Sequence, residues 1–413
     1  MLLFKPFKST YLFLFLVFNF QLICCGQNSK TVLNKTNQEN QIIKTGAERT
    51  QLYLNLLKGK NVAVVGNQTS VIVKTQQRIG KREASSFLHL VDSLLLLDVN
   101  VKKVFAPEHG FRGKADAGET VKDGFDTKTG LSIVSLYGKS KKPSSEQLAG
   151  IDVVIFDIQD VGARFYTYIS SLHYVMEACA ELGIQVIVLD RPNPNGHYID
   201  GPVLEPEHAS FVGMHKVPVV YGMTIGEYGQ MINGEKWLKN GIQCELKVIS
   251  IANYTHKTTY SLPVKPSPNL PNDKSINLYP SLCFFEGTNV SAGRGTDNQF
   301  QIYGSPFLDA SGFSFTPQSN EGAKYPKFKN QRCYGEDLRT VTNISKLELT
   351  YLIKAYKHNT AKVFFNDFFT KLAGTKKLQQ QIEQGMSEEA IRKTWESDLN
   401  TFKRIREKYL MYE

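Results

Sequence analysis

Four short segments, each the length of a β-strand, constrain the fold of this 413-residue chain more than any other feature. They are residues 62–65, 101–106, 153–156 and 186–189. They are mainly apolar instead of strictly alternating, which is typical of parallel strands that are buried on both faces. Residues 89–98 and 167–182 show helical periodicity, and Gly183 ends the second of these helices. The alternation of strand and helix predicts an α/β protein with a doubly wound sheet and right-handed crossovers.

The pattern changes after about Gly241. Residues 244–251 indicate a strand, and the proline-rich residues 261–280 indicate an extended connection. Ser345 with Glu348 predicts the start of a helix that runs through Lys357, and Ser387 predicts a final helix that reaches about Tyr409. We therefore expect a smaller α+β domain over residues 239–413 beside a sheet domain over residues 48–238.

The amino terminus has the pattern of an export sequence. Lys5 and Lys8 precede an apolar stretch over residues 11–23, which is shorter than the 20 or so residues that a membrane-spanning helix needs. Cys24 and Cys25 follow, in a sequence that loosely resembles a bacterial lipobox with Cys25 as the lipidated residue. We predict a signal peptide over residues 1–25, a flexible tether over residues 26–47, and a periplasmic or envelope-anchored location.

Composition excludes several classes of protein. A hydrophobic content of 41% with 11% aromatic residues excludes global disorder, a collagen-like repeat and a small disulfide scaffold. The net charge of +10 is diffuse outside the first 50 residues, which favours a mildly basic surface over a nucleic-acid partner. The four cysteines beyond the amino terminus contain no CxxC pair and are predicted to be buried free thiols or to form one incidental disulfide.

Polar side chains follow all four predicted strands. The segments at the strand ends are residues 66–69, 107–113, 157–166 and 190–196. Because ligands of such sheets bind beyond the carboxyl ends of the strands, we expect a binding or active site at this rim. No dinucleotide or P-loop motif is present, and no HExxH motif either. A metal site built from Glu108, His109, Asp157 and Asp160 is the less favoured alternative.

The acidic residues at the rim suggest acid catalysis. Glu108 lies at a strand end, where its side chain can face a cleft and donate a proton to a leaving oxygen. The alternative is that Glu108 only fixes its loop by pairing with Arg112 or Arg164. Asp157 or Asp160 could supply the second carboxylate that glycosidic hydrolysis generally needs, or could cap a helix. Glu227 belongs to a capping box and is predicted to be structural.

Four motifs together resemble a known family. Residues 105–113, 156–168, 189–194 and 285–289 resemble the NamZ-type exo-β-N-acetylmuramidases, bacterial peptidoglycan-recycling glycosidases, and the resemblance covers residues 48–411. It implies a Rossmann-like catalytic domain, a smaller auxiliary domain and a cleft between them. It also implies release of β-1,4-linked N-acetylmuramic acid from the non-reducing end of glycan fragments. The family's catalytic glutamate corresponds to Glu108.

From the rim and the motifs we expect the following substrate-binding residues, with no cofactor: Asn67, Gln68, His109, Arg112, Gln159, Arg164, Tyr166, Tyr168, Asp190, Arg191, Asn193, Glu286, Asn289 and Arg294. Our hypothesis is that Glu108 is the general acid and that Asp157 or Asp160 orients the acetamido group or acts as base. Arg164 and Arg191 are the arginines chosen to bind the lactyl carboxylate of muramic acid. Retaining, inverting and substrate-assisted mechanisms stay open, as do two other functions, a non-catalytic muropeptide-binding lipoprotein and a metal-dependent hydrolase or deacetylase.

Overall fold

The computed structural model describes residues 3, 42–79, 82–108, 110–112, 123–138, 140–310 and 312–413. For residues 75–79 and 82–85 only the backbone is described. The predicted signal peptide and most of the tether lie outside these residues. Residues 43–413 form one compact unit. Within the described residues, no helix is both long enough and apolar enough to cross a bilayer.

A seven-stranded sheet forms the centre of the amino-terminal part. Its spatial order is β5, β6, β4, β1, β7, β8, β9, and every neighbouring pair is parallel except β5 with β6. The bounds are β1 Val62–Gly66, β4 Val101–Ala106, β5 Gly124–Phe125, β6 Ser132–Ser135, β7 Val153–Asp157, β8 Gln185–Leu189 and β9 Leu246–Ile249. The four predicted strands and the doubly wound sheet are therefore confirmed.

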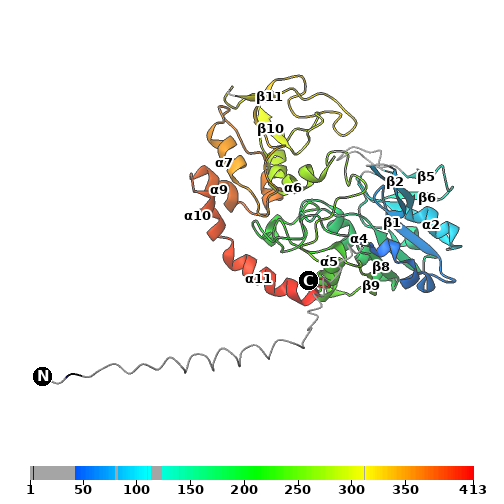
Figure 1. The fold of residues 1–413 in the computed structure, drawn as a ribbon. Helices are drawn as coiled ribbons and strands as arrows, with labels where there is room; N and C mark the ends of the chain where they lie inside the picture. The colour runs from blue at the N-terminus through cyan, green and yellow to red at the C-terminus, as the bar shows by residue number, and fades with distance from the viewer. Residues whose placement is uncertain are drawn as a thin grey trace. The chain divides into compact units, whose positions relative to one another are not determined.

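The sheet is covered on both faces, which explains the apolar strands. In β7, Val154 and Phe156 belong to one buried cluster, while Val153 and Ile155 belong to another. Successive side chains of a strand point to opposite faces, so the two clusters lie on the two sides of the sheet. The helices of this part are α2 Leu90–Leu96, α3 Ser145–Leu148, α4 Tyr168–Leu182 and α5 Ile225–Gly234. Figure 1 shows α4 and α5 beside β8 and β9.

Two helix boundaries follow the predicted local chemistry. Gly183 ends α4 in the left-handed conformation, at φ 67°, which glycine adopts without steric cost. Thr224 and Glu227 form the capping box of α5, as predicted. An antiparallel hairpin, β2 Val71–Ile79 with β3 Arg82–His89, was not predicted.

The carboxy-terminal part is mixed α and β, as predicted. A three-stranded antiparallel sheet contains β10 Ile302–Ser305, β12 Cys333–Asp337 and β11 Phe313–Phe315 in that order. The helices are α6 Asp273–Leu282, α7 Thr350–Lys357, α8 Phe368–Ala373, α9 Lys377–Glu383, α10 Glu388–Lys393 and α11 Glu396–Arg406. Short 3₁₀ turns are η1 Gly46–Glu48, η2 Thr50–Leu52, η3 Leu54–Leu56, η4 Pro206–His208, η5 Lys239–Gly241, η6 Cys283–Gly287 and η7 Glu407–Tyr409.

Three predictions in this part were wrong in detail. Ser345 does not cap a helix, because α7 begins at Thr350, whose backbone and hydroxyl both donate to Glu348. The final helix is two helices, α10 and α11, although Ser387 caps the first as predicted. The predicted extended connection over residues 261–280 contains the first eight residues of α6.

Pro280 is accommodated inside α6 by a side chain from the amino-terminal part. A proline cannot donate to the carbonyl four residues earlier, which here belongs to Ile276. The Asn195 side chain donates to that carbonyl at 3.0 Å. Asn195 lies in the loop after β8, so this contact also links α6 to the rim of the large sheet.

The boundary predicted near residue 238 stays a prediction. The strand β9 follows that boundary in sequence, yet it pairs with β8 in the large sheet. The cysteines Cys179, Cys244, Cys283 and Cys333 are buried free thiols, which is the first of the two predicted alternatives.

Candidate active site

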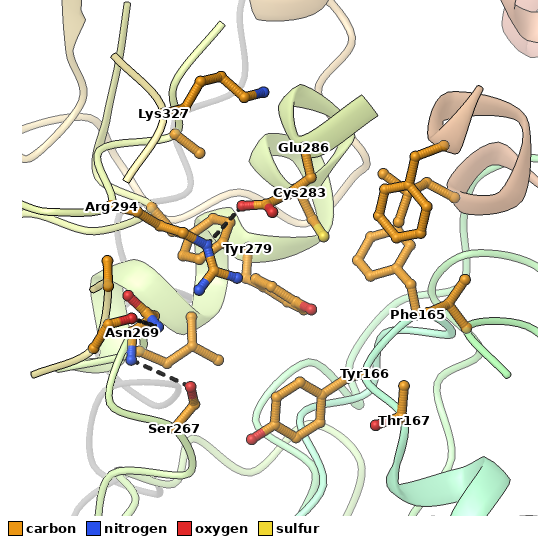
Figure 2. Close-up of a pocket in the computed structure, with 18 of the residues that line it drawn as sticks. Phe165, Tyr166, Thr167, Ser267, Asn269, Tyr279, Cys283, Glu286, Arg294 and Lys327 are labelled. Carbon is orange, nitrogen blue, oxygen red and sulfur yellow. Dashed lines mark hydrogen bonds and ion pairs between the residues drawn. The ribbon is translucent and has the colours of Figure 1, made fainter. Parts of the chain in front are cut away.

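A cavity of about 530 Å³ lies where the rim of the large sheet meets the carboxy-terminal part. Glu108, Tyr137 and Thr167 line it from the loops at the strand ends and from the start of α4. Asn269, Glu286, Arg294 and Lys327 line it from the other side (Figure 2). Its walls therefore come from two parts of the chain, residues 108–212 and residues 267–372.

Glu108 follows β4 and is partly buried on the cavity wall. The Tyr137 hydroxyl donates to its Oε1 at 3.0 Å, and the Thr167 hydroxyl donates to its Oε2 at 3.1 Å. Both carboxylate oxygens are thus oriented by hydroxyl groups, which can donate or accept. This arrangement holds the carboxyl group in either protonation state, as an acid catalyst requires.

The arginines that were considered as partners of Glu108 make other contacts. Arg112 forms a bidentate pair with Asp126, with distances of 2.9 and 2.6 Å, and also contacts Asp92. Arg164 is fully buried and donates to backbone carbonyls (Pro202, Val217, Leu372 and Ala373). Neither arginine is among the residues that line the cavity.

The wall that contains Glu286 carries two cations. The Arg294 Nε atom lies 2.7 Å from the Glu286 carboxylate. The Lys327 ammonium donates to the carbonyls of Phe285, Thr288 and Val290 at 2.6 to 3.0 Å. Burial lowers the pKa of Lys327, while the charge of Glu286 opposes that change.

Aromatic rings form the surface between the two walls. Tyr166 lines the cavity, makes an edge contact with Tyr279 and donates to the Pro266 carbonyl at 2.7 Å. Tyr279 in turn makes edge contacts with Phe165 and Phe300. Rings of this kind provide the apolar faces on which a sugar can stack. Figure 2 shows Tyr166 and Tyr279 bordering the same open space.

Asp157 and Asp160, the predicted second carboxylates, are fully buried and do not line the cavity. Asp157 accepts two hydrogen bonds from Arg191, at 2.6 and 2.9 Å. Asp160 accepts from the Tyr221 hydroxyl and from the Gly162 backbone. Burial raises the pKa of Asp160 to about 7, although these two hydrogen bonds oppose that rise. The geometry favours a structural role for both carboxylates.

Several predicted substrate-binding residues instead stabilise the loops beneath the cavity. Asp190 accepts from Thr224 at 2.7 Å and from Gly226 at 2.8 Å at the start of α5, and burial raises its pKa to about 7. Gln159 donates to the Asp160 and Pro192 carbonyls, and Asn193 donates to the Met223 carbonyl. The Asn67 side chain donates to the Tyr168 hydroxyl, which in turn donates to the Glu108 carbonyl. None of these side chains lines the cavity, so the structure gives no support for direct contact between them and a bound sugar.

Two further predicted residues do not line the cavity, and one cannot be placed. Gln68 donates to the Lys265 and Pro266 carbonyls. Asn289 donates to Asn359 and to the Val363 carbonyl, away from the cavity lining. His109 lies outside the described residues.

Sequence reasoning missed Tyr137, Thr167, Asn269 and Lys327. Thr167 directly follows Tyr166 in the motif over residues 156–168, so its position in that motif could have indicated that it lines the cavity. Tyr137 and Lys327 carry no such indication, because only the fold brings them to the cavity.

The predicted metal ligands do not gather in the part of the chain that the structure describes. There, the group of side chains with metal-binding spacing is Glu205, Glu207 and His208. Glu205 lies 2.6 Å from Lys377, and this group is separate from the cavity lining.

Two sequence profiles match nearly the whole described chain. "Exo-beta-N-acetylmuramidase NamZ, N-terminal" matches residues 62–274, and "Exo-beta-N-acetylmuramidase NamZ, C-terminal" matches residues 277–412. The chain belongs to the NamZ family. The two NamZ profiles meet inside α6, so Glu108 falls in the N-terminal match and Arg294 in the C-terminal match.

Individual relatives agree with this assignment. The chain is 36% identical to the peptidoglycan β-N-acetylmuramidase NamZ of Bacillus subtilis strain 168, over 98% of this chain and all of the relative. Two crystal structures of DUF1343 family proteins from Bacteroides fragilis NCTC 9343 are similar. One has a TM-score of 0.80 at 44% identity, and the other 0.74 at 29% identity. Both similarities cover 90% of this chain and 99% of the solved chain. The NamZ fold thus includes both walls of the cavity.

Proposed function

We propose that this chain is an exo-β-N-acetylmuramidase that releases β-1,4-linked N-acetylmuramic acid from the non-reducing ends of peptidoglycan fragments. The observation that carries the proposal is that the NamZ family match spans the chain while Glu108 lies on a cavity of sugar size. Glycosidases of most families use a carboxylic acid to protonate the leaving oxygen. Glu108, held by two hydroxyl groups, is assigned this role.

The second catalytic group is not assigned to Asp157 or Asp160, because both are buried away from the cavity. Glu286 is the other carboxylate among the described residues that line it. Two mechanisms remain consistent with this geometry, in which Glu286 acts as base or in which the acetamido group of the substrate attacks. Proton NMR of the first anomer released distinguishes inversion from retention.

The test is turnover of a chromogenic β-glycoside of N-acetylmuramic acid. Replacing Glu108 by Gln is expected to lower kcat by about 10²- to 10⁴-fold, the usual contribution of a general acid. Glu383→Gln, a change at an exposed residue of α9, is the matched control and is expected to be as active as wild type. A folded wild-type protein that binds the sugar without turnover would favour the binding-protein alternative.

The proposal includes export of the chain and attachment to a membrane by a lipid on Cys25. Its support is the sequence of residues 1–25 alone. Radioactive palmitate labelling in a bacterial host is expected to mark the wild-type chain and not the Cys25→Ser variant. Equal labelling of the two proteins would contradict lipid attachment at Cys25. Absence of label from both proteins, with the chain retained in the cytoplasm, would contradict export as well.

A further inference from the structure

Arg294 uses only part of its guanidinium group within the protein. Its Nε atom pairs with Glu286, and the group lies over the Phe300 ring, 5.3 Å from the ring centre. Among the described residues, none accepts a hydrogen bond from Nη1 or Nη2 of Arg294. Figure 2 shows these two nitrogens projecting into the cavity that Tyr166 borders. A pair of free parallel donors on a fixed arginine is suited to bind a carboxylate.

The surroundings of Arg294 favour an anion there. Arg294 and Lys327 provide two positive charges on this wall, whereas Glu286 provides one negative charge. Lys327 is held by three backbone carbonyls, so its charge is fixed close behind the wall. The net charge of this set is positive, and 24% of the Arg294 side chain is exposed, so an anion can reach it without breaking the pair with Glu286.

A free acceptor lies on the same side of the cavity. Asn269 is 1% exposed, and its Nδ2 atom donates to the Gly322 carbonyl, which fixes the orientation of the amide. Its Oδ1 atom is buried and has no partner. A buried acceptor without a partner costs free energy unless a ligand donates to it. A hydroxyl or amide N–H group of a sugar would satisfy it.

We propose that Arg294, supported by Glu286 and Lys327, binds the lactyl carboxylate of the muramic acid residue and thereby selects muramic acid over glucosamine. The inference rests on the proposed function, because it concerns the same cavity. It replaces the assignment of this role to Arg164 and Arg191, whose guanidinium groups are buried against backbone carbonyls and Asp157. Asn269 accepts from a hydroxyl or amide of the same sugar.

The test compares three ligands that differ only in the lactyl substituent of the sugar. They are N-acetylmuramic acid, its neutral lactyl amide, and N-acetylglucosamine, each titrated by calorimetry into the full-length wild type and variants. Wild type is expected to bind the acid about 10- to 100-fold more tightly than the amide, as for hydrogen bonds to charged groups. Arg294→Gln is expected to bind acid and amide equally, and Arg294→Lys, which keeps the charge beside Glu286, to give an intermediate ratio.

The matched control is Arg339→Gln, which removes an arginine paired with Asp337 outside the cavity. It is expected to keep the wild-type ratio of acid to amide affinity. Equal affinities in wild type, no binding of either ligand, or an unchanged ratio in both Arg294 variants would overturn the inference.

The same proteins are assayed for turnover of the muramic acid glycoside and its lactyl amide. Discrimination in binding without turnover would contradict the proposed function alone. Turnover of both glycosides at one kcat/KM would contradict the inference alone.

Discussion

At the scale of single residues, the Thr167 hydroxyl points to Glu108 in the cavity instead of capping a helix. Thr167 is the residue before α4, a position where a hydroxyl commonly caps the helix, yet it makes no such cap and donates to Glu108. Thr167→Val is therefore expected to lower kcat by about 10-fold, with little effect on stability, because one of the two hydrogen bonds that orient the Glu108 carboxyl group is lost. Thr167→Ser keeps the hydroxyl and should restore most of the rate. Equal rates for both variants would contradict this role.

Asp160 makes a prediction about pH. Its pKa is about 7 in the folded protein, above the value of about 3.9 in an unfolded chain. The folded state therefore holds this proton more tightly, so the stability that Asp160 contributes is present at low pH and is lost as the pH rises through this interval. In Asp160→Asn this loss is absent.

The measurement is the free energy of unfolding by urea for both proteins. The value for wild type minus that for Asp160→Asn should fall from about pH 4 to about pH 7 and then level off. Taking the difference cancels the other titrating groups, such as Asp190 and the buried histidines. A difference that does not change with pH would show that Asp160 is ionised throughout.

At the scale of elements, α6 contains a proline whose cost is offset by a neighbouring loop. Asn195→Ala removes the donor to the Ile276 carbonyl and another to Val161, and is expected to destabilise the protein by about 1–3 kcal/mol. In a Pro280→Ala background the helix supplies its own donor to Ile276, so Asn195→Ala should cost less. Urea unfolding of the four proteins gives the coupling energy. Identical costs in the two backgrounds would refute the link.

At the scale of the whole molecule, Arg164 joins the two parts of the chain. Two of its carbonyl partners, Pro202 and Val217, lie in the amino-terminal part, and two, Leu372 and Ala373, lie at the end of α8. Arg164→Met removes a donor from each of these buried carbonyls, although Val217 still accepts from the Leu204 backbone, and is expected to cost about 3 kcal/mol or more. Arg339→Met, at an exposed ion pair, is expected to change stability by less than about 0.5 kcal/mol. Similar denaturation midpoints for both variants would contradict this role of Arg164.

The centre of the sheet was predictable from the sequence because β1, β7 and β8 are apolar and buried on both faces, a property of the strand itself. The position of Glu108 on the cavity wall was predictable because strand ends converge on one rim. Which arginine faces the cavity could not be predicted, because Arg164, Arg191 and Arg294 each lie in polar or glycine-rich motifs that look alike in sequence. Their roles depend on contacts to distant residues, such as Asp157 for Arg191 and the α8 carbonyls for Arg164. The predicted start of α7 was wrong for a similar reason. The Glu348 backbone donates to the Ser281 hydroxyl, which lies 67 residues earlier in the sequence.

The charged groups of the two cavity walls come from opposite sides of α6 in the sequence. Glu108 and its hydroxyl partners precede this helix, while Glu286, Arg294 and Lys327 follow it. On the roles proposed above, the proton donor Glu108 and the carboxylate-binding Arg294 are therefore encoded in separate stretches of the gene. Exchanging residues 277–412 between relatives would pass on a preference for one sugar while leaving the proton donor untouched, which gives such enzymes a simple route to divergent specificities.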